Sequence, residues 1–178
     1  MPCAAEEFRG RVDDDGAGGA VNAERESLTS FPAFHRHWTP LLTGYLRAQT
    51  ADGRWVEDVA RESMLAARCA WGELVTCEKP GVWLFRIATT LLRRWQAKAR
   101  EQCTSLDEMA AAGPDGLLAA VRTLPRRQRE AVALRCLLGF PMPDVAEILD
   151  ESEAAAAVHV ERARGRLAEL VRPAGVDA

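Results

Sequence analysis

Apolar residues recur every three or four positions through most of the chain after residue 30, which is the spacing of amphipathic helices. This pattern predicts a helix over residues 31–48, which Pro40 is expected to bend. A second helix is predicted over residues 56–71 and a third over residues 81–100. The sequence has no strand-like alternation bounded by hairpin dipeptides, so it predicts an all-α fold.

The second half of the chain predicts a helix-turn-helix. A helix over residues 126–138 is expected to end at Gly139. A short helix follows over residues 143–149, and Ser152 is a suitable N-cap for a longer helix over residues 153–170. In a helix-turn-helix of this outline, the second helix enters the major groove of DNA.

Two breaks in the helical periodicity divide the chain. Residues 1–30 are acidic and Gly-rich and have too few apolar groups to offset the entropy of the chain, so they are predicted to be a disordered extension. Residues 101–114 are predicted to be a flexible linker. We therefore expect two small helical domains, at 31–100 and 115–171, followed by a flexible tail at 172–178.

The formal net charge of −3 is unevenly distributed along the chain. Residues 31–100 carry a net charge of +5, whereas residues 1–30 carry −4, residues 101–123 carry −3 and residues 124–178 carry −1. This distribution excludes a protein that binds nucleic acid by bulk charge, and it indicates a local basic face on the third predicted helix. The basic residues of that face are Arg86, Arg93, Arg94, Lys98 and Arg100.

Several classes of protein lack support in the sequence. No apolar run approaches the length of about 18 residues needed to span a membrane, and the acidic first residues are unlike a signal peptide, so a cytoplasmic protein without membrane insertion is expected. The five cysteines are never spaced as CxxC, so no zinc site or disulfide framework is predicted. No carboxylate pair, Ser-His-Asp set or phosphate-binding Gly loop stands out, so we predict no catalytic residues, no metal, no cofactor and no enzymatic activity.

Three stretches carry motifs that occur together in one known family. The first is the acidic sequence EDVARESML at 57–65, and the second is WLFRIA at 83–88. The third is LPRRQREAV at 124–132, which is followed by VAEIL at 145–149 and RARGRL at 162–167. In this order and spacing, they resemble the extracytoplasmic-function sigma factors of bacterial RNA polymerase, the compact sigma-70-like class that keeps only sigma domains 2 and 4.

The resemblance implies a sigma factor that directs core RNA polymerase to promoters and initiates transcription. Domain 2 of this family binds the clamp helices of the largest polymerase subunit and captures the unpaired non-template strand of the minus-ten element. Domain 4 sits on the flap of the second-largest subunit and reads the minus-thirty-five element as duplex. An anti-sigma factor is a further partner that is common in the family.

Carried over residue by residue, the resemblance implies three sets of site residues. The implied polymerase-binding residues are Glu57, Asp58, Arg61, Glu62, Met64 and Leu65. The implied minus-ten residues are Trp83, Arg86, Thr89, Thr90, Arg93 and Arg94. The implied helix-turn-helix residues are Ser152, Glu153, Ala155, Ala156, Ala157, His159, Arg162 and Arg164.

The predicted recognition helix departs from the family pattern. Ala155 and Ala157 stand where the family usually has Thr and Lys, and His159 replaces a usual Arg. Alanine offers no hydrogen bond to a base edge. Asp150 and Glu151 replace the Gly and the apolar residue of the turn and add negative charge near the expected DNA. We therefore expect weak or altered recognition of a minus-thirty-five element.

Two other functions are compatible with the same residues. One is a stand-alone helix-turn-helix regulator that binds duplex DNA and never meets the polymerase. The other is a degenerate sigma-like protein that acts through protein–protein binding, for which the alanine-rich helix is the best support. The tryptophans also have a purely structural interpretation as core anchors.

Overall fold

The structure, a computed structural model, describes residues 28–102 and 116–171. The predicted extension up to residue 27, the linker from residue 103 and the tail from residue 172 lie outside the described residues. Every regular element within the described ranges is helical, which confirms the predicted all-α fold.

The first described helices form an N-terminal unit, which we define as α2 to α5. These are α2 (Phe31–Gln49), α3 (Gly53–Cys69), α4 (Trp71–Leu74) and α5 (Pro80–Gln102). The side chains of Ser30 and Asp52 cap α2 and α3 by accepting hydrogen bonds from the backbone N–H groups of Ala33 and Arg54. Pro40 lies within α2 and does not interrupt it.

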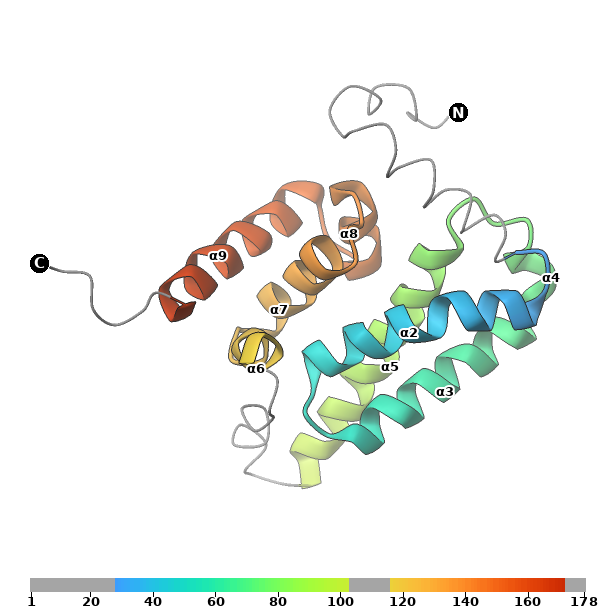
Figure 1. Ribbon diagram of the computed structural model, residues 1–178, viewed down its shortest axis with the longest axis horizontal. Helices are drawn as coiled ribbons and strands as arrows, with labels where there is room; N and C mark the ends of the chain where they lie inside the picture. Colours follow the sequence, from blue (N-terminus) through green and yellow to red (C-terminus); the bar gives the residue numbers. More distant parts are fainter. Residues whose placement is uncertain (1–27, 103–115, 172–178) are drawn as a thin grey trace, which may run out of the picture.

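α2, α3 and α5 lie side by side (Figure 1). Large apolar side chains hold them together. Phe34 and Tyr45 of α2 and Phe85 of α5 are fully buried. Gly81, at the start of α5, lies against the ring of Trp38, which occupies the space that a Cβ would need. The close approach of α5 to α2 therefore depends on a glycine at this position.

The remaining helices form a C-terminal unit, which we define as α6 to α9. These are α6 (Gly116–Arg122), α7 (Arg126–Val132), the π-helical turn η1 (Ala133–Leu137), α8 (Met142–Leu149) and α9 (Glu153–Val171). The sequence analysis did not predict α6, and it treated α7 and η1 as one α-helix. At η1 the N–H of Leu138 donates to the carbonyl of Ala133, which is the i→i+5 pattern of a π-helix.

The helix-turn-helix outline of the C-terminal unit is confirmed. The turn between α8 and α9 places Asp150 in the left-handed region, with a φ of 58°, where glycine is the residue with the least strain. The hydroxyl of Ser152 accepts a hydrogen bond from the N–H of Ala155 and so caps α9, as predicted. α9 packs on α7 and α8 through Ala156, Val160 and Ala163.

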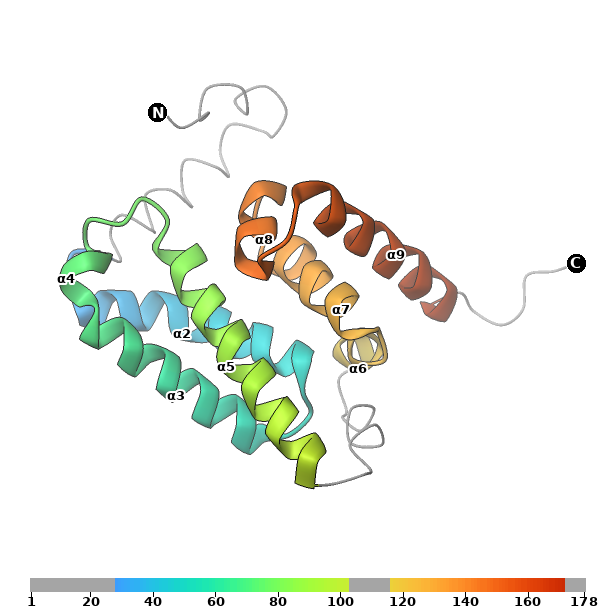
Figure 2. The same cartoon turned by 180° about the vertical axis from the view of Figure 1, so that it is seen from behind.

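The two units pack against each other, as the two opposite views show (Figures 1 and 2). α2 lies against α6 and α7, and α5 lies against α8. The rings of Phe85 and Phe140 meet edge to face across this boundary, with centroids 5.3 Å apart. The described parts of the two predicted domains therefore share a buried boundary.

Candidate functional site

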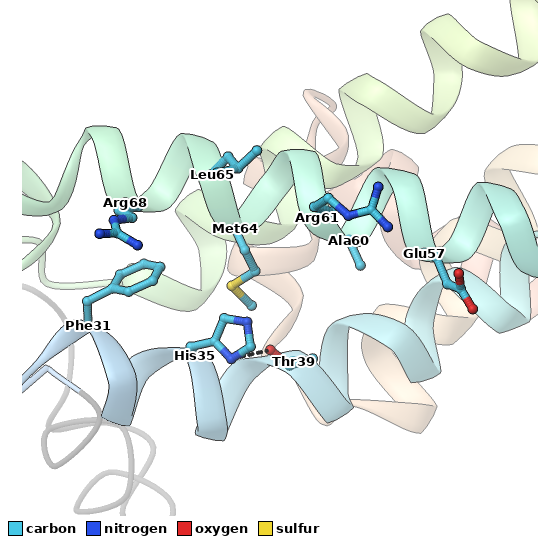
Figure 3. A pocket seen from close by; sticks show the side chains of 9 residues that line it. All are labelled: Phe31, His35, Thr39, Glu57, Ala60, Arg61, Met64, Leu65 and Arg68. Atoms are coloured by element: carbon cyan, nitrogen blue, oxygen red, sulfur yellow. Dashed lines mark hydrogen bonds between the residues drawn. The ribbon is translucent and has the colours of Figure 1, made fainter.

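A groove of about 470 Å³ lies between α2 and α3 (Figure 3). Figure 3 shows the side chain of Met64 pointing from α3 toward α2, with Leu65 farther out on α3. Met64 is 5% exposed and forms part of the apolar floor, whereas Leu65 is 55% exposed. The residues that line the groove are Phe31, His35, Thr39, Glu57, Ala60, Arg61, Met64, Leu65 and Arg68.

Charged groups border this apolar floor. Arg61 donates to the carboxylate of Asp58 at 3.2 Å, and Glu62 is exposed on the same helix outside the groove. The guanidinium of Arg68 lies over the ring of Phe31, 5.8 Å from its centroid. An apolar floor with charged edges suits the docking of an amphipathic helix from another protein. Four of the six implied polymerase-binding residues line the groove, namely Glu57, Arg61, Met64 and Leu65.

A second candidate site runs along the exposed face of α5. A hollow of about 380 Å³ is lined by Trp83, Arg86, Ile87, Thr90, Leu91 and Arg94. Trp83 is partly buried, whereas Arg86, Thr90 and Arg94 are exposed. Four of the six implied minus-ten residues thus lie together, with an aromatic ring beside two guanidinium groups. Aromatic rings that can stack on bases, next to cations that can bind phosphates, are typical of surfaces for single-stranded nucleic acid.

The same face continues toward the C-terminal end of α5. Arg94 also lines a neighbouring hollow of about 500 Å³, together with Trp55, Trp95, Lys98 and Ala99. The sequence analysis did not assign Trp55 to a site. It lies at the start of α3, far from α5 in the sequence, and only the packing of α3 on α5 brings it to this face.

Thr89 does not contribute to the exposed face. Its side chain is 1% exposed and forms a 2.8 Å hydrogen bond with the hydroxyl of Tyr45 in the core. Burial, with a smaller contribution from the charge of Glu130, raises the pKa of Tyr45 far above its ordinary value, so this phenol stays neutral. The implied contact of Thr89 with the minus-ten strand is corrected here, because Thr89 offers no surface to DNA.

Arg93 is directed toward the C-terminal unit. Its Nε and Nη2 donate to the two carboxylate oxygens of Glu130, at 3.0 and 2.7 Å. Glu130 is 2% exposed, and Arg126 and Arg127 also lie within 4.0 Å of its carboxylate. Burial alone would lower the pKa of Arg93, but the hydrogen bonds and charge of Glu130 outweigh burial and raise it. The sequence analysis missed this ion pair, which joins residues 37 positions apart.

The implied residues of the helix-turn-helix differ in their exposure. Ser152, Glu153, Arg162 and Arg164 are exposed, and Ala155, Ala157 and His159 are partly exposed. Ala156 is fully buried against the rest of the C-terminal unit, so its implied contact with DNA is corrected. The Nε2 atom of His159 lies 3.4 Å from the carboxylate of Glu151, which in turn lies 3.0 Å from Arg127.

Over residues 28–102 and 116–171, no group of three or more His, Cys, Asp or Glu side chains is arranged to hold a metal ion. Within the same ranges, no helix is both long and apolar enough to cross a membrane.

Comparisons with known proteins agree with this architecture. Residues 115–167 match the family model for sigma-70, region 4. A chain in the co-crystal structure of the sigma factor RpoE in complex with the anti-sigma factor NepR from Bartonella quintana is 22% identical and has a TM-score of 0.71, and the match covers 82% of this chain and 98% of that chain. A chain in the structure of CnrH in complex with the cytosolic domain of CnrY is 23% identical with a TM-score of 0.62, over 88% of this chain and 97% of that chain. A comparison with curated proteins finds no match.

The described helices therefore share the fold of the chains in these two solved structures. The match to sigma-70, region 4 falls on the C-terminal unit of this fold.

Proposed function

We propose that this protein is a sigma factor that binds core RNA polymerase, directs it to promoters and initiates transcription in the cytoplasm. The observation that carries the proposal is the match of residues 115–167 to sigma-70 region 4 within a chain that has the whole two-domain fold. The protein itself has no catalytic part in this function, since it supplies specificity to the polymerase.

The groove between α2 and α3 is the proposed contact with the polymerase. In this proposal the clamp helices of the largest subunit dock in the groove. A helix with an apolar stripe would place that stripe over Met64 and Leu65. Glu57 and Arg61 would then lie at the edges of the contact, where charges contribute more to orientation and association rate than to affinity.

The exposed face of α5 is the proposed contact with the minus-ten strand. Trp83 can stack on an unpaired base, and Arg86 and Arg94 can bind the adjoining phosphates. Thr90, whose hydroxyl donates to the carbonyl of Arg86 in its own helix, keeps its lone pairs for a base or a water.

The C-terminal unit offers less for reading duplex DNA. The exposed cations of α9 are Arg162, Arg164 and Arg166, and Arg164 already lies 3.4 Å from Glu161. Ala155 and Ala157 at the start of the helix can contact a thymine methyl group but donate no hydrogen bond. We propose that this unit mainly holds the polymerase flap and contributes little minus-thirty-five specificity.

Reconstitution with core RNA polymerase tests the proposed function. The full chain is expected to be retained by immobilised core polymerase and to support transcription from a subset of a random promoter library, whose start sites are then mapped. Failure of the full chain to bind core polymerase would reject the proposal.

The alanine-rich start of α9 favours a second candidate, a sigma-like protein that binds polymerase without selecting promoters. Polymerase binding with no selected promoter in the same library would support this candidate. The stand-alone regulator is a third outcome, in which duplex DNA is bound and core polymerase is not.

An anti-sigma factor is a further proposed partner. The sigma factor RpoE named above was crystallised in complex with the anti-sigma factor NepR. For this chain, the α2–α3 groove is the proposed surface for such a protein, because one helix-binding groove can serve alternative helical partners.

A further inference from the structure

Five carboxylates of the C-terminal unit gather at its boundary with α5, which is the face proposed above to bind DNA. They are Glu130, Asp144, Glu147, Asp150 and Glu151. The proposed function leaves these acids unexplained, because a protein that binds DNA gains nothing from negative charge beside its DNA-binding side chains.

Two basic side chains at this boundary form ion pairs with these acids. Arg93 makes the bidentate pair with Glu130 described above. Lys79, which directly precedes α5, donates to Asp144 at 2.6 Å and lies 3.6 Å from Glu147. Both carboxylate partners are largely shielded, with side-chain exposures of 2% for Glu130 and 14% for Asp144.

A third basic side chain faces the remaining acids. Arg86 shares a hollow of about 360 Å³ with Glu147, Asp150 and Glu151. Arg86 also lines the hollow beside Trp83 in the candidate minus-ten face. The helix-turn-helix turn therefore lies at the edge of the proposed binding surface for single-stranded DNA.

A carboxylate that binds an arginine guanidinium occupies the same donors that a phosphate would use. Both anions present two oxygens to the N–H fork of arginine, and both neutralise its charge. The Nε and Nη2 donors of Arg93 cannot serve Glu130 and a DNA phosphate at the same time. The acids and a DNA strand are therefore mutually exclusive partners of this face.

We propose that the basic face of α5 has two alternative occupants, the carboxylates of the C-terminal unit in the free protein and the phosphates of promoter DNA in the active one. This inference rests on the proposed role of α5 in binding the minus-ten strand. The arrangement in the structure is a closed form in which the acids of the C-terminal unit compete with DNA, and separation of the two units would free Arg93 from Glu130 and move the acids away from Arg86.

The turn between α8 and α9 contributes two acids to this boundary. Asp150 adopts a left-handed conformation, which aspartate tolerates better than most residues, and it lines the hollow beside Arg86. Glu151 is held by Arg127 and His159 within its own unit and lines the hollow that Arg86 enters. Asp150 and Glu151 carry negative charge that disfavours the binding of duplex DNA by α9. In this proposal, the same charge stabilises the closed form.

The test removes charge from the boundary without changing the proposed DNA-binding residues. The variant Asp144→Asn with Glu147→Gln removes both acids that face Lys79. Its matched control, Glu161→Gln with Glu169→Gln, makes the same change in net charge on exposed positions of α9 away from this boundary. Both full-length variants are compared with the wild-type chain for radius of gyration by small-angle X-ray scattering and for affinity to a labelled 20-nucleotide single-stranded DNA.

The boundary variant is expected to be more extended than the wild type and to bind the strand about threefold more tightly than the control, because apparent affinity rises with the fraction of open molecules. A variant as compact as the wild type would overturn the role of these pairs in closure. An extended variant that binds DNA no better than the control would overturn the competition. Lys79→Gln breaks the same pairs from the other side and is expected to extend the chain even if the double variant folds poorly.

The scattering measurement separates this inference from the proposed function. If neither the wild type nor any variant binds the strand, the role of α5 in DNA binding fails and the competition fails with it. The compactness of the variants still decides whether the carboxylate pairs hold the two units together.

Discussion

The N-terminal unit (residues 31–102) and the C-terminal unit (residues 116–171) are both helical, yet they present opposite surfaces. The N-terminal unit exposes an apolar groove and an aromatic, basic face along α5. The C-terminal unit turns carboxylates toward α5. In the proposed function, the first unit contacts the polymerase clamp helices and the unpaired strand, whereas the second unit holds the polymerase flap and, by the proposed competition, controls access to α5.

The largest expected effect comes from the groove between α2 and α3. Leu65→Asp places a charge on the most exposed apolar side chain of the groove, where it would be desolvated in a complex. We expect the affinity for core RNA polymerase to fall by at least about 30-fold, or about 2 kcal/mol, as for a central interface residue.

Leu170→Asp is the control, because Leu170 is similarly exposed at the end of α9 and lies outside the groove. Affinity is measured by fluorescence anisotropy with labelled protein. Equal losses in the two variants would show that the groove has no special role in polymerase binding.

A second prediction concerns the packing of α5 on α2, which does not involve the groove. Gly81→Ala forces a methyl group into the space that the ring of Trp38 occupies, so the free energy of unfolding should fall by about 1 to 2 kcal/mol. Gly44→Ala, in the middle of α2 with open space around it, is expected to raise stability by about 0.5 to 1 kcal/mol. Urea denaturation of both variants measures this contrast, and a stable Gly81→Ala protein would contradict the close packing of α5 on α2.

A third prediction addresses the exposed face of α5. Arg94 lines both of its hollows, and no ion pair to another described residue was found for it. Arg94→Ala is expected to weaken binding to single-stranded DNA about fivefold and to reduce the slope of log affinity against log salt by about 0.7, the loss of one phosphate contact. Arg162→Ala on α9 removes the same charge from the other unit and should leave both quantities nearly unchanged.

Most of the fold could be predicted from the sequence because the signals that define a helix lie within a few residues of one another. The apolar spacing from Phe31 to Tyr45 and the cap at Ser152 each depend on neighbours within a few residues. The seven-residue α6 was missed because it is short and largely apolar and shows no polar face.

The candidate site was predicted in part, and its errors have a common origin. Thr89 lies four residues after the buried Phe85, and Ala156 lies four residues before the buried Val160, so both were already on buried helix faces. Motif resemblance assigned them to DNA without regard to that spacing. The pair between Arg93 and Glu130 could not be predicted, because it depends on how two separate units pack.

The smallest expected effect tests whether the C-terminal unit can be given the DNA contact that its sequence lacks. Ala157 is partly exposed on α9, one turn after the N-cap Ser152. Ala157→Lys places a cation where a phosphate of duplex DNA would lie if the helix entered the major groove, and we expect affinity for duplex promoter DNA to rise two- to threefold, about 0.5 kcal/mol. The gain is small because the N-terminus of a helix disfavours a positive charge and because Glu151 and Glu153 lie nearby in the sequence.

Ala168→Lys adds the same charge to an exposed position near the other end of α9 and is the matched control. If both lysines strengthen duplex binding equally, the gain is general electrostatic attraction, and the start of α9 has no specific place on the duplex.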